Sequence, residues 1–261
     1  IKSGRLKKLA ILNDKELALV IVEALENVKI VDKNLSTSRS QIYKRTEVDL
    51  NCKRHRAIFD TEHIIPNFCF GCYKVQIEVH NILHLVRLAG LFYQMNFQFN
   101  PNRKCLIEMR PNIPGLYKGL IYCRGLNHAE SVKEQLDVRL KYIDKSLSAT
   151  IKKGCAEYPL VFPQYSKIGS NKENIMQYEK SWEKIERKFD EKKSVKGSRY
   201  SYPSLQEFCL SDILIIHKWI DYAKGVGDPS ASFFSSLPIK YKDTLEIGKS
   251  RARDGLSLDK I

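Results

Sequence analysis

The chain has 261 residues, of which 43% are hydrophobic and 28% charged, a balance typical of globular proteins with one or two domains. It carries 44 lysines and arginines against 30 aspartates and glutamates, a formal net charge of +14, and such an excess attracts polyanions, nucleic acid first among them. No apolar run approaches the roughly 20 residues that cross a bilayer, and the first residues lack the apolar stretch of a signal peptide, so we expect neither a membrane span nor secretion but a cytoplasmic protein.

The first 68 residues predict a helix followed by a basic arm. Asn13 and Asp14 can cap a helix over residues 13–25, and residues 28–31 fit a short strand. Hydroxyl and basic side chains then follow one another over residues 36–56 without a clear period, which is typical of an exposed loop. Such a loop could hold a phosphate backbone, although an ordinary linker has the same composition. Its candidate contacts are Lys44, Arg45, Arg54 and Arg56.

The middle of the chain has the clearest periodicity. Residues 72–79 alternate apolar and polar side chains, as a half-buried strand does, and residues 80–97 change to helical spacing. Two more alternating runs, at 104–110 and 116–124, surround a turn that contains proline and glycine. We expect these two runs to pair as a hairpin.

A second helix and a last strand follow the hairpin. Asn127 and Glu130 have the spacing of a capping box at the start of a helix over residues 127–144, and residues 148–158 predict a strand that ends at a proline. This order predicts an α+β, ferredoxin-like (βαββαβ) fold, which is a four-stranded antiparallel sheet with both helices on one face. The predicted domains are an N-terminal helix and basic arm at 1–68, the ferredoxin-like core at 69–168, and a C-terminal helical extension packed on the core at 169–261.

The second face of this sheet is predicted to carry charged side chains. Strand alternation places Lys74, Gln76 and Glu78 there. An antiparallel sheet often leaves one face in water, so plain solvation explains the pattern as well as a binding surface does. As a binding surface, the face would contact phosphates and offer a stacking ring. The residues for these roles are Arg110, Tyr122, Arg124 and Lys152.

Part of the hairpin and the helix after it resembles an RNA-recognition motif. The likeness covers residues 72–158, and where that family has two aromatics in its third strand, this chain has Leu120 and Tyr122, one of the two. The resemblance implies RNA binding on the sheet face. Together with the net charge, it makes a nucleic-acid binding protein, RNA first, the leading prediction. The residues that carry the likeness are Lys118, Gly119, Tyr122 and Ala129.

The seven cysteines lie in no dense framework, which predicts reduced thiols. The topology brings five of them toward one edge of the sheet, and a Cys-x-x-Cys pair with further thiolates nearby could hold zinc or an iron–sulfur cluster. Side-chain direction favours core packing instead, because Cys105, Cys123 and Cys155 share their faces with apolar residues. The residues of the alternative metal site are Cys69, Cys72, Cys123 and Cys155.

Catalytic motifs are few. The chain has no phosphate-binding loop, dinucleotide-binding glycine pattern or zinc-protease motif. Asp60, Glu62 and His63 lie close together, and such groups could bind Mg²⁺ or transfer protons, although a surface turn has the same composition. They support a second prediction, a metal-dependent enzyme that acts on phosphate-bearing or nucleotide substrates.

The C-terminal part is predicted to be helical. Ser170 and Glu173 can cap an amphipathic helix whose apolar residues recur in steps of three and four, and this face must pack on the core or on a partner protein. A further helix, opened by Ser204 and Glu207 and ended by two glycines, is apolar around its circumference, which indicates burial. A helix-mediated assembly protein is thus the third prediction. The apolar face consists of Ile175, Tyr178, Trp182, Ile185 and Phe189.

Overall fold

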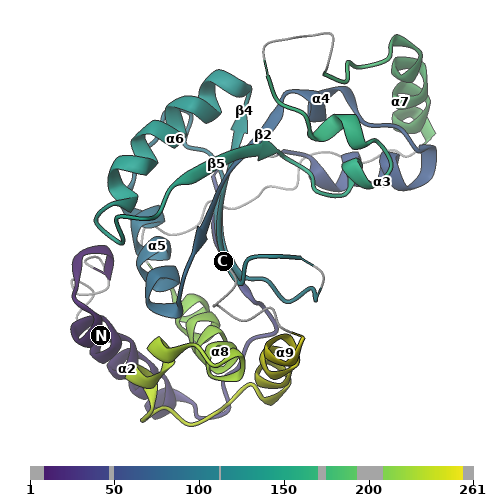
Figure 1. The fold of residues 1–261 in the computed structure, drawn as a ribbon. Coiled ribbons are helices and arrows are strands. Elements are labelled where there is room, and N and C mark those ends of the chain that lie inside the picture. Colours follow the sequence, from purple (N-terminus) through teal and green to yellow (C-terminus); the bar gives the residue numbers. More distant parts are fainter. Residues whose placement is uncertain (1–8, 47–49, 112, 170–174, 193–207, 255–261) are drawn as a thin grey trace.

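The computed structural model describes residues 9–46, 50–111, 113–169, 175–192 and 208–254. They form an α+β fold around one five-stranded antiparallel sheet (Figure 1). The strands, in the order β1-β3-β4-β2-β5 across the sheet, are β1 (Gln41–Lys44), β2 (Cys72–Val79), β3 (Arg103–Ile107), β4 (Tyr117–Arg124) and β5 (Ala149–Lys153). The α+β class is confirmed. The predicted four-stranded, ferredoxin-like sheet is wrong, because β1 adds a fifth strand at the edge.

The four strands predicted from alternation lie next to one another in the sheet. β2 lies between β4 and β5, and β3 pairs with β4 as the predicted hairpin. β5 ends at Lys153, before the predicted end at residue 158. The added strand β1 pairs with β3, and Tyr43 lies opposite Lys104.

Helices α5 (Ile82–Gln94) and α6 (Leu126–Leu140) cover one face of the sheet (Figure 1). The Asn81 side chain caps α5 by accepting a hydrogen bond from the His84 amide at 2.8 Å, which satisfies a donor at the helix start. Gly119 in β4 lets α5 lie close to the sheet, because an added Cβ would lie 2.6 Å from the Leu88 side chain. The main core consists of the inward side chains of the sheet and these helices, among them Val75, Ile77, Leu88, Ile121, Val132 and Leu136.

The C-terminal helices complete the same core. α8 (Leu210–Val226) and α9 (Lys242–Arg253) meet at Gly225 and Gly248, where an added Cβ on Gly225 would overlap the Leu245 carbonyl oxygen. Trp219 of α8 is fully buried and donates a hydrogen bond to the Ser40 carbonyl at 2.8 Å. Also part of this core are α2 (Asp14–Val31) and the 3-10 turns Leu9–Ile11 and Pro229–Phe234.

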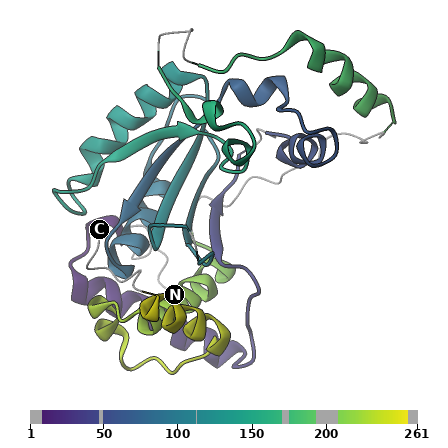
Figure 2. The same ribbon diagram turned by 45° about the vertical axis from the view of Figure 1, so that its right-hand side comes forward.

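A second apolar cluster lies beyond one end of the sheet. It is enclosed by α3 (Cys52–Glu62), α4 (Asn67–Phe70), α7 (Lys180–Lys192) and the 3-10 turns Tyr158–Leu160 and Pro163–Ser166. Figures 1 and 2 both show α3 and α7 on this end, away from α8 and α9. Trp182 and Phe189 are buried in the cluster, and Tyr178 and Ile185 pack against it. The helix face predicted to bind a partner therefore packs largely within the chain itself.

Several local predictions are wrong. The apolar stripe of α2 continues through Val28 to a cap at Asp32, so residues 28–31 are helix and not strand. The predicted basic arm at 36–56 contains β1 and the start of α3. α6 begins after Gly125, whose φ of 86° turns the chain, and Asn127 is not its cap. Outside the described residues lie the predicted caps Ser170, Glu173, Ser204 and Glu207.

Within the described ranges, no helix combines the length and the apolar character needed to cross a membrane.

Candidate functional site

The sheet face turned away from α5 and α6 is rich in charged side chains, and we call it the polar face. The register places on it the residues that alternate with the core side chains Val75, Ile77 and Ile121. Basic residues outnumber acidic ones, which gives the face a positive potential. Its charged and aromatic residues are Tyr43, Lys74, Glu78, Lys104, Glu108, Arg110, Lys118, Tyr122, Arg124 and Lys152.

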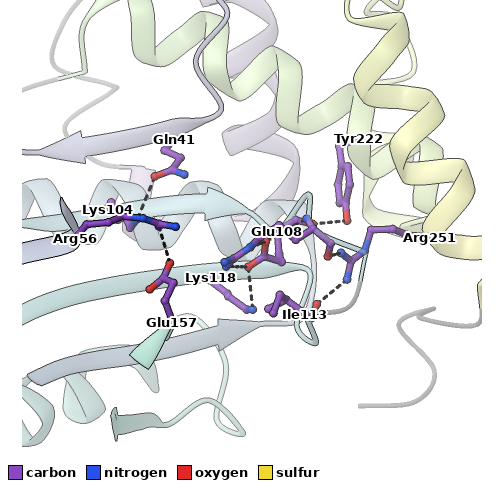
Figure 3. Close-up of polar contacts among 10 residues, drawn as sticks. Gln41, Arg56, Lys104, Glu108, Ile113, Lys118, Glu157, Tyr222 and Arg251 are labelled. Atoms are coloured by element: carbon purple, nitrogen blue, oxygen red, sulfur yellow. Dashed lines mark hydrogen bonds and ion pairs between the residues drawn. The ribbon is translucent and has the colours of Figure 1, made fainter. Parts of the chain in front are cut away.

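Two tyrosines and a lysine form the side of the polar face near β1. The Lys104 ammonium lies 5.5 Å from the centre of the Tyr43 ring and 5.9 Å from that of Tyr122, and it donates a hydrogen bond to Gln41 Oε1 at 3.2 Å (Figure 3). Burial lowers the pKa of Lys104, and the positive charge of Lys74 lowers it further. Aromatic rings next to cations are the elements with which proteins bind bases and phosphates of single strands.

A carboxylate lies between two cations further along the polar face, directly after the end of β3. Glu108, whose side chain is 4% exposed, accepts hydrogen bonds from Arg110 Nε and Nη2, both at 2.8 Å, and from Lys118 Nζ at 3.4 Å (Figure 3). Burial alone would raise the pKa of Glu108, but the bonds from Arg110 and the charge of Lys118 outweigh it and lower the pKa. Glu108 is therefore charged at neutral pH, and it neutralises part of the local positive charge.

Helices α8 and α9 hold the β3–β4 connection in place. Tyr222 of α8 donates to the Glu108 carbonyl at 3.1 Å, and Arg251 of α9 donates to the carbonyls of Ile113, at 2.9 Å, and Arg110 (Figure 3). Arg251 is 1% exposed. These bonds fix the backbone from which Arg110 extends, and thereby its position beside the polar face.

Four predicted binding residues lie on the polar face. Tyr122, Arg124 and Lys152 are placed there by the register, and Arg110 by its bonds to Glu108. Arg124 and Lys152 are exposed, which leaves their charges open to a ligand. Burial raises the pKa of Tyr122, so its hydroxyl stays protonated at neutral pH.

The predicted contacts of the basic arm are mostly engaged within the protein. Lys44 faces the helix side of the sheet, where its ammonium donates to the Tyr93 carbonyl at 2.8 Å. Arg54, with a side chain 15% exposed, pairs with Asp190 at 2.7 Å and Glu186 at 3.1 Å. For both residues the contact with nucleic acid stays a prediction, and these bonds within the chain do not favour it.

The other two arm residues are exposed. The Arg45 guanidinium lies 5.2 Å from the Tyr43 ring centre, at the β1 edge of the polar face. Arg56 pairs with Glu157 at 3.3 Å and with Asp60 at 3.4 Å. Exposed pairs of this kind contribute little to stability, so Arg56 can exchange its partner for a phosphate.

The four cysteines of the predicted metal site do not converge. Cys72 lies opposite Arg124, and Cys123 lies opposite the next residue, Tyr73, so these two thiols are on different faces of the sheet. Burial raises the pKa of each to about 12, which keeps both protonated. No three His, Cys, Asp or Glu side chains within the described ranges are grouped so that they could hold a metal ion.

The other two cysteines belong to the second cluster. Cys69 is buried, with its sulfur 3.4 Å from the Tyr158 hydroxyl, and Cys155 packs against the same cluster. The prediction that Cys155 faces α5 and α6 is wrong, because β5 ends at Lys153 and the alternation of the strand does not reach it. Cys105 does lie in the main core, as predicted.

The candidate catalytic residues lie at the end of α3. Asp60, Glu62 and His63 are exposed, and Asp60 pairs with Arg56. His63 ends the helix in the left-handed conformation, with a φ of 55°. The catalytic role predicted for them remains a prediction without a supporting contact.

Several residues of the polar face were not predicted from the sequence as contacts for nucleic acid. Lys104 and Lys118 belong to the two alternating runs, so their face was readable from the sequence. Tyr43 had no such signal, because β1 has only four residues and follows a serine-rich stretch.

No protein family, no curated protein and no solved structure matches this chain.

Proposed function

We propose that this protein binds nucleic acid, with RNA as the first candidate, through the polar face of its sheet. The observation that carries the proposal is the gathering of basic side chains and two tyrosines on one face, opposite the helices of the main core. Glu108 is already paired with Arg110 and Lys118, so it adds little repulsion toward an anion.

The chemistry of the polar face suits a single-stranded nucleic acid. Phosphates are attracted by Arg124, Lys152 and the other cations, and displacement of their counterions supplies most of the affinity. A base that is not held in a duplex can stack on Tyr43 or Tyr122, and stacking is possible with every base. RNA is preferred as the ligand because proteins recognise it mainly through single-stranded, unstacked segments.

The test measures the affinity for a labelled single-stranded RNA as the salt concentration rises. We expect the logarithm of the association constant to fall linearly with the logarithm of the salt concentration, with a slope of about −0.7 for each phosphate contact. The double variant Arg124→Glu, Lys152→Glu should lose at least about tenfold in affinity and have a smaller slope. A DNA strand of the same sequence shows whether the 2′-hydroxyl matters.

A matched control separates the polar face from net charge. Lys15 and Lys33 are exposed on and beside α2, and the variant Lys15→Glu, Lys33→Glu changes the net charge by the same amount. We expect this control to change the affinity less than about twofold at moderate salt. Equal losses in the two double variants would contradict the proposal, as would binding that does not depend on salt.

A further inference from the structure

Lys74 is a buried cation on the polar face, in the strand next to the edge strand β5. It belongs to β2, which lies between β4 and β5, and the register places it opposite Tyr122 on one side and Lys152 on the other. The residue is 8% exposed. A long charged side chain is rarely so deeply buried unless it is paired.

The ammonium of Lys74 has no hydrogen bond or ion pair to any residue that the structure describes. The carboxylate that acts on it, Glu157, pairs with Arg56 at 3.3 Å. Among the described residues, the positive charge of Lys74 therefore has no counter-charge within hydrogen-bond distance.

This arrangement is costly in the folded chain. Burial lowers the pKa of Lys74 and the charges of Lys152 and Lys118 lower it further, while Cys155 and Glu157 act in the other direction. Like charges directly opposite each other on neighbouring strands destabilise a sheet, and the partial burial of an ammonium group without a hydrogen-bond partner adds a desolvation penalty. A bound anion would remove both costs.

We infer that Lys74 and Lys152 together bind one phosphate group of the nucleic acid on the polar face, where β2 pairs with β5, an inference that rests on the proposed function. An oxyanion above β2 would accept hydrogen bonds from both ammonium groups. Tyr122 lies on the other side of Lys74, so a nucleotide whose phosphate occupies this site has an aromatic ring beside it for its base. This phosphate site thereby sets the position of the bound nucleic acid, while the exposed arginines add electrostatic attraction.

The experiment compares two labelled strands of equal length, an RNA and an abasic strand that has the phosphates but no bases. We expect Lys74→Met to weaken the binding of both strands about tenfold. Lys74→Arg, which keeps the charge, should recover part of the loss. Tyr122→Leu should weaken the RNA alone, because the abasic strand has nothing to stack. Lys145→Met, at an exposed lysine in the connection between α6 and β5, is the control and should change neither affinity.

The outcomes separate this inference from the proposed function. If the affinity of Lys74→Met stays within about twofold of wild type while the double variant at Arg124 and Lys152 loses its affinity, the phosphate site at Lys74 is wrong, but nucleic-acid binding by the polar face is still supported. If the wild-type protein binds neither strand, both are wrong.

A second measurement uses only the wild-type protein, so its result does not depend on whether a variant folds. In the wild-type chain, an amine-acylating reagent followed by mass spectrometry reports the reactivity of each lysine. RNA should slow the modification of Lys74 and Lys152 several-fold and leave Lys15 unchanged. Equal protection of all three lysines, or none, would overturn the inference.

Discussion

Arg103 and Lys44, on the helix side of the sheet, and Lys74, on the polar face, are all buried cations but differ in their partners. On the face toward the helices, Arg103 donates to the carbonyls of Phe92, at 2.7 Å, and Met95, at 2.6 Å, and Lys44 donates to that of Tyr93 at 2.8 Å. On the polar face, Lys74 is buried to a similar extent but has no such partner among the described residues. Arg103 and Lys44 thus stabilise the fold through hydrogen bonds to backbone carbonyls, whereas Lys74 makes no such bond to a described residue.

This difference shows that burial alone does not mark a binding site. A buried charge whose donors are all satisfied is part of the folded structure, and removing it leaves acceptors unpaired. A buried charge without a partner costs stability, and binding can recover that cost. The comparison therefore predicts that substitutions at Arg103 and at Lys74 change the free energy of unfolding in opposite directions.

The largest effect is expected at Arg103, which is 1% exposed and also donates to Asn100 Oδ1 at 3.0 Å and to the Pro101 carbonyl at 3.3 Å. Arg103→Met should lower the free energy of unfolding by about 3–5 kcal/mol, because the carbonyls it served become unsatisfied. Urea denaturation measures the change. The matched control is Lys104→Met, on the next residue and the opposite face, where we expect a loss below about 1 kcal/mol. Equal losses at the two positions would contradict the comparison.

An intermediate effect is expected at Lys44, and it depends on pH. Burial lowers the pKa of Lys44 from 10.5 to about 8, with a contribution from the charge of Arg103. Between these two values the unfolded chain holds a proton that the folded chain lacks, so the contribution of Lys44 to the free energy of unfolding rises with pH in this window. The slope cannot exceed about 1.4 kcal/mol per pH unit, the limit for one proton.

The measurement at Lys44 is a difference between two proteins. Urea denaturation of wild type and Lys44→Met between pH 8 and pH 10.5 cancels the titration of the groups that both chains share. The stability of wild type relative to the variant should rise with pH across the window. A difference that is constant, or that falls, would show that Lys44 is not held in the folded chain as described.

Much of the sheet could be predicted from its sequence, because the buried face imposes a period of two. The alternation in residues 72–79 gave the bounds of β2, and the same parity placed Lys74, Tyr122, Arg124 and Lys152 on one face, where the register also puts them. A shift by one residue would move the core side chains into water. The pattern is for that reason reliable wherever a strand is long enough to show it.

The remaining parts depend on contacts that a local pattern does not contain. β1 has only four residues and gains its order from pairing with β3. α3 has few buried residues, His55 and Ile58 among them, so its apolar period is too weak to stand out from the basic residues around it. For α7 the spacing predicted the apolar face, but the second cluster that covers it comes from distant segments of the chain.

The smallest effect on stability is expected at Lys74, and its sign is the informative part. Lys74→Met should raise the free energy of unfolding by about 0.2–1 kcal/mol, because it removes the like-charge pair with Lys152 and keeps an unbranched side chain in the same space. Urea denaturation at neutral pH and low salt measures it, and Lys152→Met, which removes the same repulsion from an exposed residue, should give a smaller gain. A loss of stability at Lys74 comparable with that at Arg103 would mean that its ammonium is satisfied within the folded chain. A gain, together with weaker binding of RNA, is the combination expected of a residue that is kept for its ligand and not for the fold.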